Sequence, residues 1–268
     1  MKPKEVNQRQ FVQSLARGCN VLAKVCKSET QLSLSELAKK SDLSIGAIQR
    51  LTYTLENIGL LERDPRTKRF RTGPRMISLA LAIVHNMELT KVAHPFMQAL
   101  SDEIGEVVGL GAMEGDSIIL VDIINTQQPK QLLNINRNTG AIIPPHATST
   151  GKAILAFLPE SRVEAILSSQ GLAKLTDNTI ASAKALKREL DLVRERGFAT
   201  AFDENVYGMT TIGAPVRDSS GDVIAAMTIM IPSMKISKKK FVSAFRKKVV
   251  KTADKISAAM GYLKDADK

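Results

Sequence analysis

Polar side chains at helical spacing give residues 44–53 a surface suited to binding. Gln49, Arg50 and Tyr53 fall on one face of a predicted helix, opposite its apolar residues. Three further residues share this face: Ser44, Ile45 and Gly46. Amide and guanidinium groups pair with base edges in the DNA major groove and also donate to phosphates. We therefore expect this face to contact double-stranded DNA, the alternative being an ordinary solvated helix face.

A cluster of cations follows the same helix. Five basic side chains lie between Arg63 and Arg71. Neutralising phosphates with Lys and Arg supplies most of the sequence-independent affinity for DNA. We expect contacts to phosphates or the minor groove from Arg66, Lys68, Arg69 and Arg71. The alternative is a basic loop that only keeps the protein soluble.

The elements that must position these groups are two short helices and a hairpin. Ser33 and Glu36 have the spacing of a capping box at the start of the first helix. Ser44 is the predicted N-cap of the second helix, and Gly59 ends it. Two short strands within residues 60–72 then enclose a turn. This order predicts a winged helix-turn-helix, whose second helix enters the major groove.

The core of this part is predicted from the apolar positions. A preceding helix over residues 8–27, interrupted near Gly18, should bury Phe11, Leu15, Val21, Leu22 and Val25. The second helix of the motif should bury Ala47, Leu51, Leu55 and Ile58, with Ile48 beside them. Ala38 supplies the small residue that lets the two helices approach. Asp42 stands where a positive φ is expected and Gly is common.

Few residues are candidates for catalysis. Asp203 and Glu204 could perform acid–base chemistry, but no nucleophile–base pair accompanies them, which favours a loop that lines a pocket. Residues 148–153 contain Gly-Lys without the flanking positions of a phosphate-binding loop. The histidines and cysteines lack a metal-ligand spacing, and Cys19 and Cys26 are expected to be small apolar residues. We expect no enzyme activity, no cofactor and no metal.

Charge is distributed unevenly along the 268 residues. The formal net charge is +11, which favours a polyanionic partner. Residues 1–75 carry fifteen basic and seven acidic side chains, and residues 234–268 carry eleven and three, so each segment has a net charge of +8. The remainder is therefore slightly acidic. Without a signal peptide, a long apolar run or a disulfide framework, we expect a cytoplasmic protein that does not bind membranes.

Beyond the hairpin, residues 74–89 predict a linker helix and residues 90–268 a second domain. The linker is too apolar for a solvated helix, which indicates that it packs on a partner chain. Strands are predicted at residues 107–113, 118–124, 132–135, 141–144, 210–217 and 223–231, and helices at 89–104, 150–157, 160–167, 182–196 and from about 241 to 263. Antiparallel hairpins with helices at their sides indicate an α+β domain.

The order of these motifs resembles the IclR family of bacterial transcriptional regulators. The resemblance covers nearly the whole chain and rests on residues 11–18, 34–64, 69–75, 146–159, 197–199 and 208–229. It implies a winged helix-turn-helix over residues 1–73, a linker helix over 74–89, and a GAF-like effector-binding domain over 90–268. It also implies assembly as a homodimer or a homotetramer.

The resemblance further implies an effector pocket for a small carboxylate. Carried over to this sequence, its residues are Ser149, Thr150, Asp203, Glu204, Thr211, Thr228 and Met230. Three residues depart from the family pattern: Ala201 stands where an acid is common, Thr211 where some members have Cys, and Met230 where some have a hydroxyl residue. We therefore expect a larger, partly apolar or aromatic organic acid.

The first hypothesis is a ligand-responsive DNA-binding regulator that reads a palindromic or near-palindromic operator as a dimer or a dimer of dimers. Two alternatives remain: a GAF-fold enzyme acting on a small acid, and an architectural DNA-binding protein without an effector. GAF-fold enzymes that reduce oxidised methionine rely on cysteines, which residues 76–268 lack.

Overall fold

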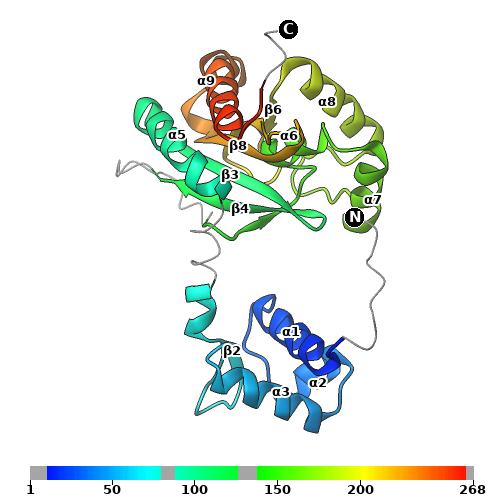
Figure 1. The fold of residues 1–268 in the computed structure, drawn as a ribbon. Coiled ribbons are helices and arrows are strands. Elements are labelled where there is room, and N and C mark those ends of the chain that lie inside the picture. Colours follow the sequence, from blue (N-terminus) through cyan, green and yellow to red (C-terminus); the bar gives the residue numbers. More distant parts are fainter. Residues whose placement is uncertain (1–10, 80–87, 126–137, 264–268) are drawn as a thin grey trace. The chain divides into compact units, whose positions relative to one another are not determined.

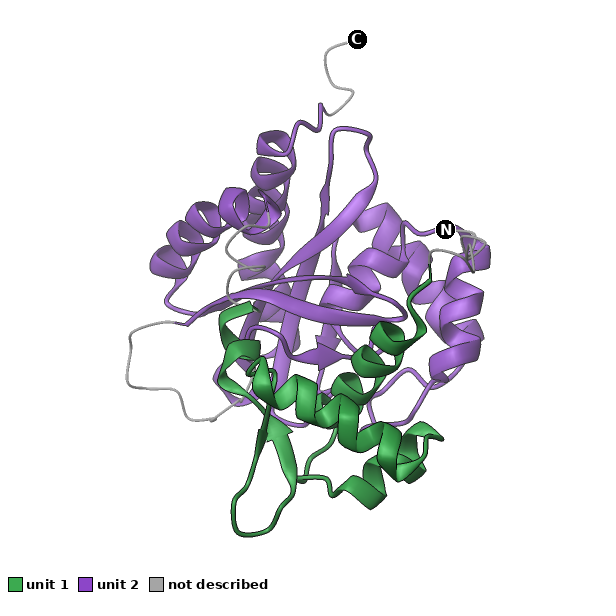
Figure 2. Cartoon of the chain, turned by 60° about the horizontal axis from the view of Figure 1, so that its bottom comes forward, with its two compact units in different colours: residues 1–85 green, residues 86–268 purple. Residues whose placement is uncertain are grey.

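The computed structural model describes residues 11–79, 88–125 and 138–263. The chain forms two compact units, residues 1–85 and 86–268 (Figure 2). The division lies inside the segment predicted as a linker helix. Residues 74–79 of that segment are helical, and residues 80–87 lie outside the described residues.

Before the helical residues 74–79, the described part of the first unit contains three helices and a two-stranded sheet. The helices are α1 (Gln13–Cys26), α2 (Leu34–Ser41) and α3 (Ile45–Asn57), and the strands are β1 (Leu61–Arg63) and β2 (Phe70–Thr72). Side chains from all three helices and both strands share one core, whose fully buried members include Val21, Leu37, Ile48 and Phe70. This is the predicted winged helix-turn-helix, with β1, β2 and their turn as the wing.

Local hydrogen bonds fix the ends of the helices as predicted. The Ser33 hydroxyl accepts from the Glu36 amide at 3.3 Å, and the Ser33 amide donates to the Glu36 carboxylate at 2.7 Å, which completes the capping box. Asp42 adopts the left-handed conformation with φ 52°. Ser44 caps α3 through the Ala47 amide.

Three packing predictions in this unit were wrong. Gly18 does not interrupt α1: it is buried where α1 passes α3, and a Cβ there would lie 3.7 Å from Leu51. Phe11 and Leu15 precede the part of α1 that packs on the core, and they are 52% and 66% exposed. Ile58 is exposed as well, since the buried face of α3 runs through Ile48, Thr52 and Leu55.

The wing is joined to the loop between α1 and α2. Leu32 and Phe70 form an isolated antiparallel bridge, in which each amide donates to the other's carbonyl, at 3.1 and 2.8 Å. Arg69 adds a hydrogen bond of 2.8 Å to the carbonyl of Gln31. Leu32, which precedes α2, therefore pairs with the first residue of β2 and links the wing to the start of the motif.

The second unit is built on a six-stranded antiparallel sheet with strand order β5-β4-β3-β8-β7-β6. Its strands are β3 (Val107–Glu114), β4 (Ser117–Ile124), β5 (Ile142–Ile143), β6 (Ala199–Phe202), β7 (Met209–Arg217) and β8 (Val223–Pro232). Its helices are α5 (Glu88–Ile104), α6 (Ser149–Leu155), α7 (Glu160–Gln170), α8 (Ala183–Arg196), the short 3-10 helix η1 (Ser233–Lys235) and α9 (Lys238–Ala259).

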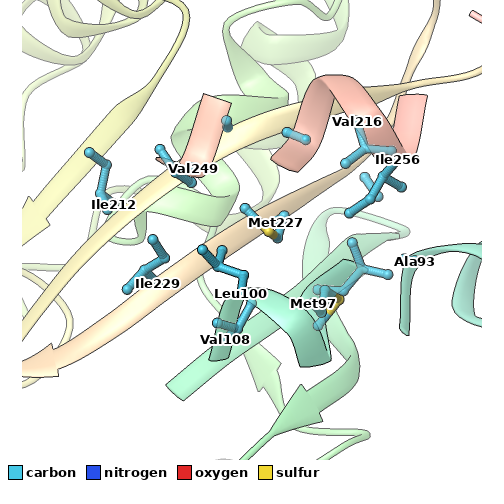
Figure 3. Packing of buried hydrophobic residues seen from close by; sticks show 14 of the residues in the cluster. Ala93, Met97, Leu100, Val108, Ile212, Val216, Met227, Ile229, Val249 and Ile256 are labelled. Atoms are coloured by element: carbon cyan, nitrogen blue, oxygen red, sulfur yellow. The ribbon is translucent and has the colours of Figure 1, made fainter. Parts of the chain in front are cut away.

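The sheet separates two hydrophobic cores (Figure 1). Helices α5 and α9 cover one face, where Met97, Met227 and Ile256 are among the fully buried side chains (Figure 3). Helices α6, α7 and α8 cover the other face, over Leu120 and Ala226. This three-layer α+β arrangement is the predicted fold class.

Several elements differ from the predicted ones. Residues 199–202, which are in none of the predicted strands, form β6, an edge strand of four residues that pairs with β7. Ile142 and Ile143 pair with β4 as a two-residue strand, and the predicted strand at residues 132–135 lies outside the described residues. Leu263 was predicted to continue the buried stripe of α9 but is 88% exposed, because the helix ends at Ala259. Among the described helices, none combines the length and the apolar character needed to cross a membrane.

Candidate DNA-binding surface and effector site

The outer face of α3 presents the predicted recognition residues. Gln49 and Arg50 are exposed, and within the described residues their side chains make no hydrogen bond or ion pair. Tyr53 is 68% and Ile45 is 55% exposed. Ser44 and Gly46 are exposed at the start of the helix, and a Cβ on Gly46 would meet no atom within 4 Å. The six predicted residues thus share one open surface.

The wing turn is organised by Asp64. Its carboxylate accepts from the amides of Arg66 and Thr67 at 2.9 and 2.8 Å. These two backbone hydrogen bonds lower the pKa of the Asp64 carboxyl below its usual value. Lys68 has φ 58°, a left-handed conformation that closes the turn. The result is an ordered loop from which the side chains of Arg66 and Lys68 extend into solvent.

The four predicted wing cations fall into two groups. Arg66 and Lys68 are exposed and unpaired within the described residues. Arg71 forms two hydrogen bonds to the Glu62 carboxylate on the neighbouring strand, at 3.1 and 3.2 Å. Arg69 bonds to Glu36 at 3.0 Å and is only 41% exposed, so its guanidinium is largely committed inside the protein. Sequence reasoning did not separate these groups, because the partner of Arg69 lies thirty-three residues away.

The predicted effector residues gather on the α6 side of the large sheet. Thr211 on β7 lies directly opposite Met230 on β8. The Ser149 and Thr228 hydroxyl oxygens are 3.0 Å apart, and Thr228 also donates to the carbonyl of Ile212 at 3.1 Å. All of these side chains are buried. The Ser149 and Thr228 hydroxyl groups thus satisfy each other inside the protein, as buried polar groups normally do.

A small cavity lies beside this cluster. It measures about 10 Å³ and is lined by Ala147, Thr148, Ala201, Glu204, Asn205, Val206, Met209 and Thr211. Of the seven predicted effector residues, Glu204 and Thr211 line it. Thr148 was missed although it is the N-cap of α6, where its hydroxyl accepts from the Gly151 amide at 3.1 Å. Met209 was missed because it lies one residue before the predicted start of β7.

The remaining predicted effector residues point elsewhere. The Met230 methyl group lies 2.9 Å from where a Cβ on Gly109 would be, and the Thr150 methyl group lies 2.7 Å from the corresponding position on Gly111. Both side chains therefore pack over the glycines of β3. Asp203 has φ 56°, and its carboxylate accepts from the Gly208 amide and the Ser233 hydroxyl. It closes the loop before β7 and is not among the cavity-lining residues.

A buried ion pair adjoins the cavity. The Lys152 ammonium, whose side chain is 1% exposed, lies 2.8 and 2.9 Å from the two carboxylate oxygens of Glu204. Glu189 is 3.9 Å from the same ammonium and is also bonded to Arg196. Burial raises the pKa of the Glu204 carboxyl, and the positive charge of Lys152 opposes that rise. This pair was not predicted, because nothing near Lys152 in the sequence distinguishes it from an exposed lysine of a helix.

The other groups considered for chemistry are dispersed. His94 bonds to Asp122 at 2.7 Å, and His146 bonds to the carbonyl of Ala173 at 3.1 Å. Cys19 and Cys26 are both exposed, contrary to the prediction of small apolar packing residues. Within the described ranges no three His, Cys, Asp or Glu side chains are grouped as metal ligands.

Comparisons with known proteins agree with this architecture. Residues 14–65 match the model of the IclR helix-turn-helix domain, and residues 81–258 match that of the bacterial transcriptional regulator IclR C-terminal domain. The HTH-type transcriptional repressor AllR of Klebsiella pneumoniae is 30% identical over 263 residues, which cover 98% of this chain and 95% of that protein. AllR of Escherichia coli K12 is 29% identical over 249 residues, covering 93% and 90%.

Solved structures show the same fold. The IclR of Thermotoga maritima superposes with a TM-score of 0.67 at 27% identity, covering 93% of this chain and 99% of that one. An IclR homologue from Microbacterium hydrocarbonoxydans, crystallised with 4-hydroxybenzoate, gives a TM-score of 0.74 at 24% identity, covering 92% and 98%. With both family models matched in order along one chain, this protein belongs to the IclR family of bacterial transcriptional regulators.

Proposed function

We propose that this IclR-type, ligand-responsive DNA-binding regulator acts as a repressor, as the AllR relatives are named, and that an organic acid controls its affinity for a palindromic operator. The observation that carries the DNA-binding part is the exposed face of α3, whose Gln49 and Arg50 side chains, like those of Arg66 and Lys68 of the wing, have no partner in the described part of the chain. In this proposal Gln49 and Arg50 contact base edges, and Arg66 and Lys68 contact phosphates.

A titration of DNA at several salt concentrations tests this division. Arg50→Ala should weaken operator binding by about 1–3 kcal/mol while leaving random DNA nearly unchanged, because a base contact is lost. Lys68→Ala should weaken both equally and reduce the slope of log K against log salt by about 0.9, because one phosphate contact is lost. Arg69→Ala is a different case, since it should lower stability through the lost contact with Glu36. Equal losses on operator and random DNA for both Arg50 and Lys68 would contradict the assignment.

For assembly, we propose that the linker helix packs against a second copy of the chain. Ile77 and Leu79 are 65% and 45% exposed on the helical residues 74–79. Apolar side chains of this size gain about 1.5–3 kcal/mol each on full burial, which favours association. A two-fold dimer would present two copies of α3 to the two halves of a palindrome.

For the effector, we propose an organic acid, aromatic acids included, that binds at the buried hydroxyl cluster and the adjoining cavity. The cavity of about 10 Å³ holds about one water, whereas ligand pockets measure about 300–1,000 Å³. Binding must therefore displace side chains. The lining residue best placed to move is Val206, which is 44% exposed on the loop before β7. Such a displacement would couple the ligand to the conformation of the domain.

The acidic nature of the ligand is tested with matched compounds. The Microbacterium homologue was crystallised with 4-hydroxybenzoate, so an aromatic acid series is the first to screen by thermal shift. An acid that stabilises the wild-type protein should lose its effect when the carboxylate is replaced by a carboxamide. The Thr211→Val variant, which keeps the side-chain volume, should bind it more weakly. Equal stabilisation by the acid and the amide would contradict the proposal.

A further inference from the structure

A second concave surface, shallow and open, lies beside β6, the edge strand of the sheet. A groove of about 830 Å³ runs between the C-terminal end of α8, the start of β6 and the outer face of α9. One wall carries Arg196 and Phe198, and the other is formed by α9 from Arg246 to Ala258. Figure 1 shows α9 as the orange-to-red helix of the second unit. None of the DNA-contact or effector residues proposed above lines it.

The rim of this groove is strongly basic. Four cations project from α9 into it: Arg246, Lys247, Lys251 and Lys255. All four are exposed, and none forms a hydrogen bond or an ion pair with another described residue. Arg196 on the facing wall is the fifth cation and is partly neutralised by Glu189. A single acid, Asp254, also lines the groove. Outside the groove, Glu103 of α5 forms its ion pair with Lys248, and the charges of Lys251 and Lys255 act on the same carboxylate only from a greater distance and help to lower its pKa.

The groove also has apolar walls. Phe198, Val250 and Ala258 line it between the cations, with the aliphatic parts of the lysine side chains. The Arg196 guanidinium lies 5.0 Å from the centre of the Phe198 ring, which places charge beside an apolar surface. A DNA backbone would leave such walls uncovered, because phosphate and sugar offer little apolar surface. A ligand with acidic and apolar groups would pair with the cations and also cover the apolar walls.

The spacing of the lysines favours a ligand that is itself a helix. Lys247, Lys251 and Lys255 follow one another at intervals of four residues, which is about 6 Å along a helix. Acidic residues four apart on a second helix have the same interval, so a helix lying along α9 would pair with each lysine in turn. Its apolar residues three and four apart would face the groove walls.

We propose that this groove binds an acidic amphipathic helix of another protein. The bound helix presents carboxylates to the three lysines and aliphatic side chains to Val250 and Ala258. This surface is independent of the DNA and effector sites, so a regulator bound to its operator could recruit or be held by such a partner.

The test uses the full-length protein and a fluorescent, end-capped peptide of eighteen residues with glutamates at four-residue intervals beside a stripe of leucines. Fluorescence anisotropy should show saturable binding. The charge reversal Lys247→Glu with Lys251→Glu should weaken it by about tenfold or more, since two exposed ion pairs become repulsions. The matched control, Lys239→Glu with Lys240→Glu, changes two exposed lysines of α9 outside the groove and should alter the dissociation constant less than twofold.

Three results would overturn the proposal. The first is no binding of the peptide to the wild-type protein, and the second is equal binding of a peptide with glutamine in place of glutamate. The third concerns DNA: if the Lys247 and Lys251 reversals lowered the salt slope for random duplex DNA by about 1.8, the groove would be a phosphate-binding surface. Arg50→Ala should leave peptide binding unchanged, so a failure of the DNA assignment is distinguishable from a failure of this one.

Discussion

Replacing Lys152 with Met should destabilise the second unit more than any exposed substitution. The Lys152 side chain is 1% exposed and is bonded to both oxygens of Glu204. Met nearly matches the aliphatic length of Lys, so the variant removes the charge and keeps most of the packing. Removing one partner of a buried pair leaves the other charge uncompensated and costs about 3–5 kcal/mol. Glu189 is itself a carboxylate, so it cannot replace the lost cation, and its charge adds to burial in raising the pKa of Glu204.

Urea unfolding, followed by circular dichroism, measures this loss. A second variant, Lys152→Met with Glu204→Gln, should recover at least half of it, since the uncompensated carboxylate is then absent. Lys184→Met is the matched control on exposed α8 and should lie within about 0.5 kcal/mol of the wild type. A loss below about 1 kcal/mol for Lys152→Met, or no recovery in the double variant, would refute the argument.

The pH dependence of the same variant supplies a second check. Burial already raises the pKa of Glu204, and removing the Lys152 charge removes the main opposing influence. A carboxyl group whose pKa is higher in the folded state than its unfolded value of about 4.3 stabilises the fold fully below about pH 4.3. This contribution is lost as the pH rises through the folded-state pKa. The deficit of Lys152→Met should therefore be larger at pH 8 than at pH 5, and the Glu204→Gln double variant should abolish the difference.

Three further predictions concern the first unit. Gly73→Ala should destabilise this unit by about 3 kcal/mol in thermal unfolding, because a Cβ there would lie 2.3 Å from the carbonyl oxygen of Gly59. Gly46 has open space around it, so Gly46→Ala should instead stabilise α3 by up to about 1 kcal/mol. Backbone hydrogen bonds lower the pKa of Asp64, so the wing should stay ordered above about pH 3.9, the pKa of an unfolded Asp, and lose order as the pH falls further. Hydrogen exchange at the wing amides should show this pH dependence for the wild type and not for Asp64→Asn. Ile77→Glu should dissociate the assembly, as measured by light scattering, if the linker helix packs on a second copy.

Local signals made the first unit predictable from sequence. The Ser33–Glu36 capping box, the Ser44 cap and the left-handed Asp42 each depend on residues within four positions of one another, and all three are present in the structure. Helix and strand positions in the second unit followed from periodicity for the same reason. The short strand β6 was missed because four residues give too little alternation to be distinguished from a loop.

The details of the candidate sites depend on distant contacts and could not be predicted in this way. Two of the wing cations are paired, Arg71 with Glu62 on the neighbouring strand and Arg69 with Glu36 across the fold, and the second contact has no local signal in the sequence. Lys152 is buried only because the loop before β7 brings Glu204 to it, fifty-two residues further along the chain. Met230 points away from the cavity because the neighbouring strand has a glycine, Gly109, which leaves space for its methyl group.

The backbone bridge between Leu32 and Phe70 has a consequence for how DNA is selected. It joins the wing to the segment that leads into α2, and the wing strands share a core with α3, so we expect the wing and α3 to move together. In the proposed complex, the separation between a major-groove contact from α3 and a phosphate contact from the wing would then vary little. A duplex of different groove width must deform to satisfy both, and its deformation energy depends on base steps that the protein does not touch. Operator preference should therefore extend to the flexibility of the flanking sequence.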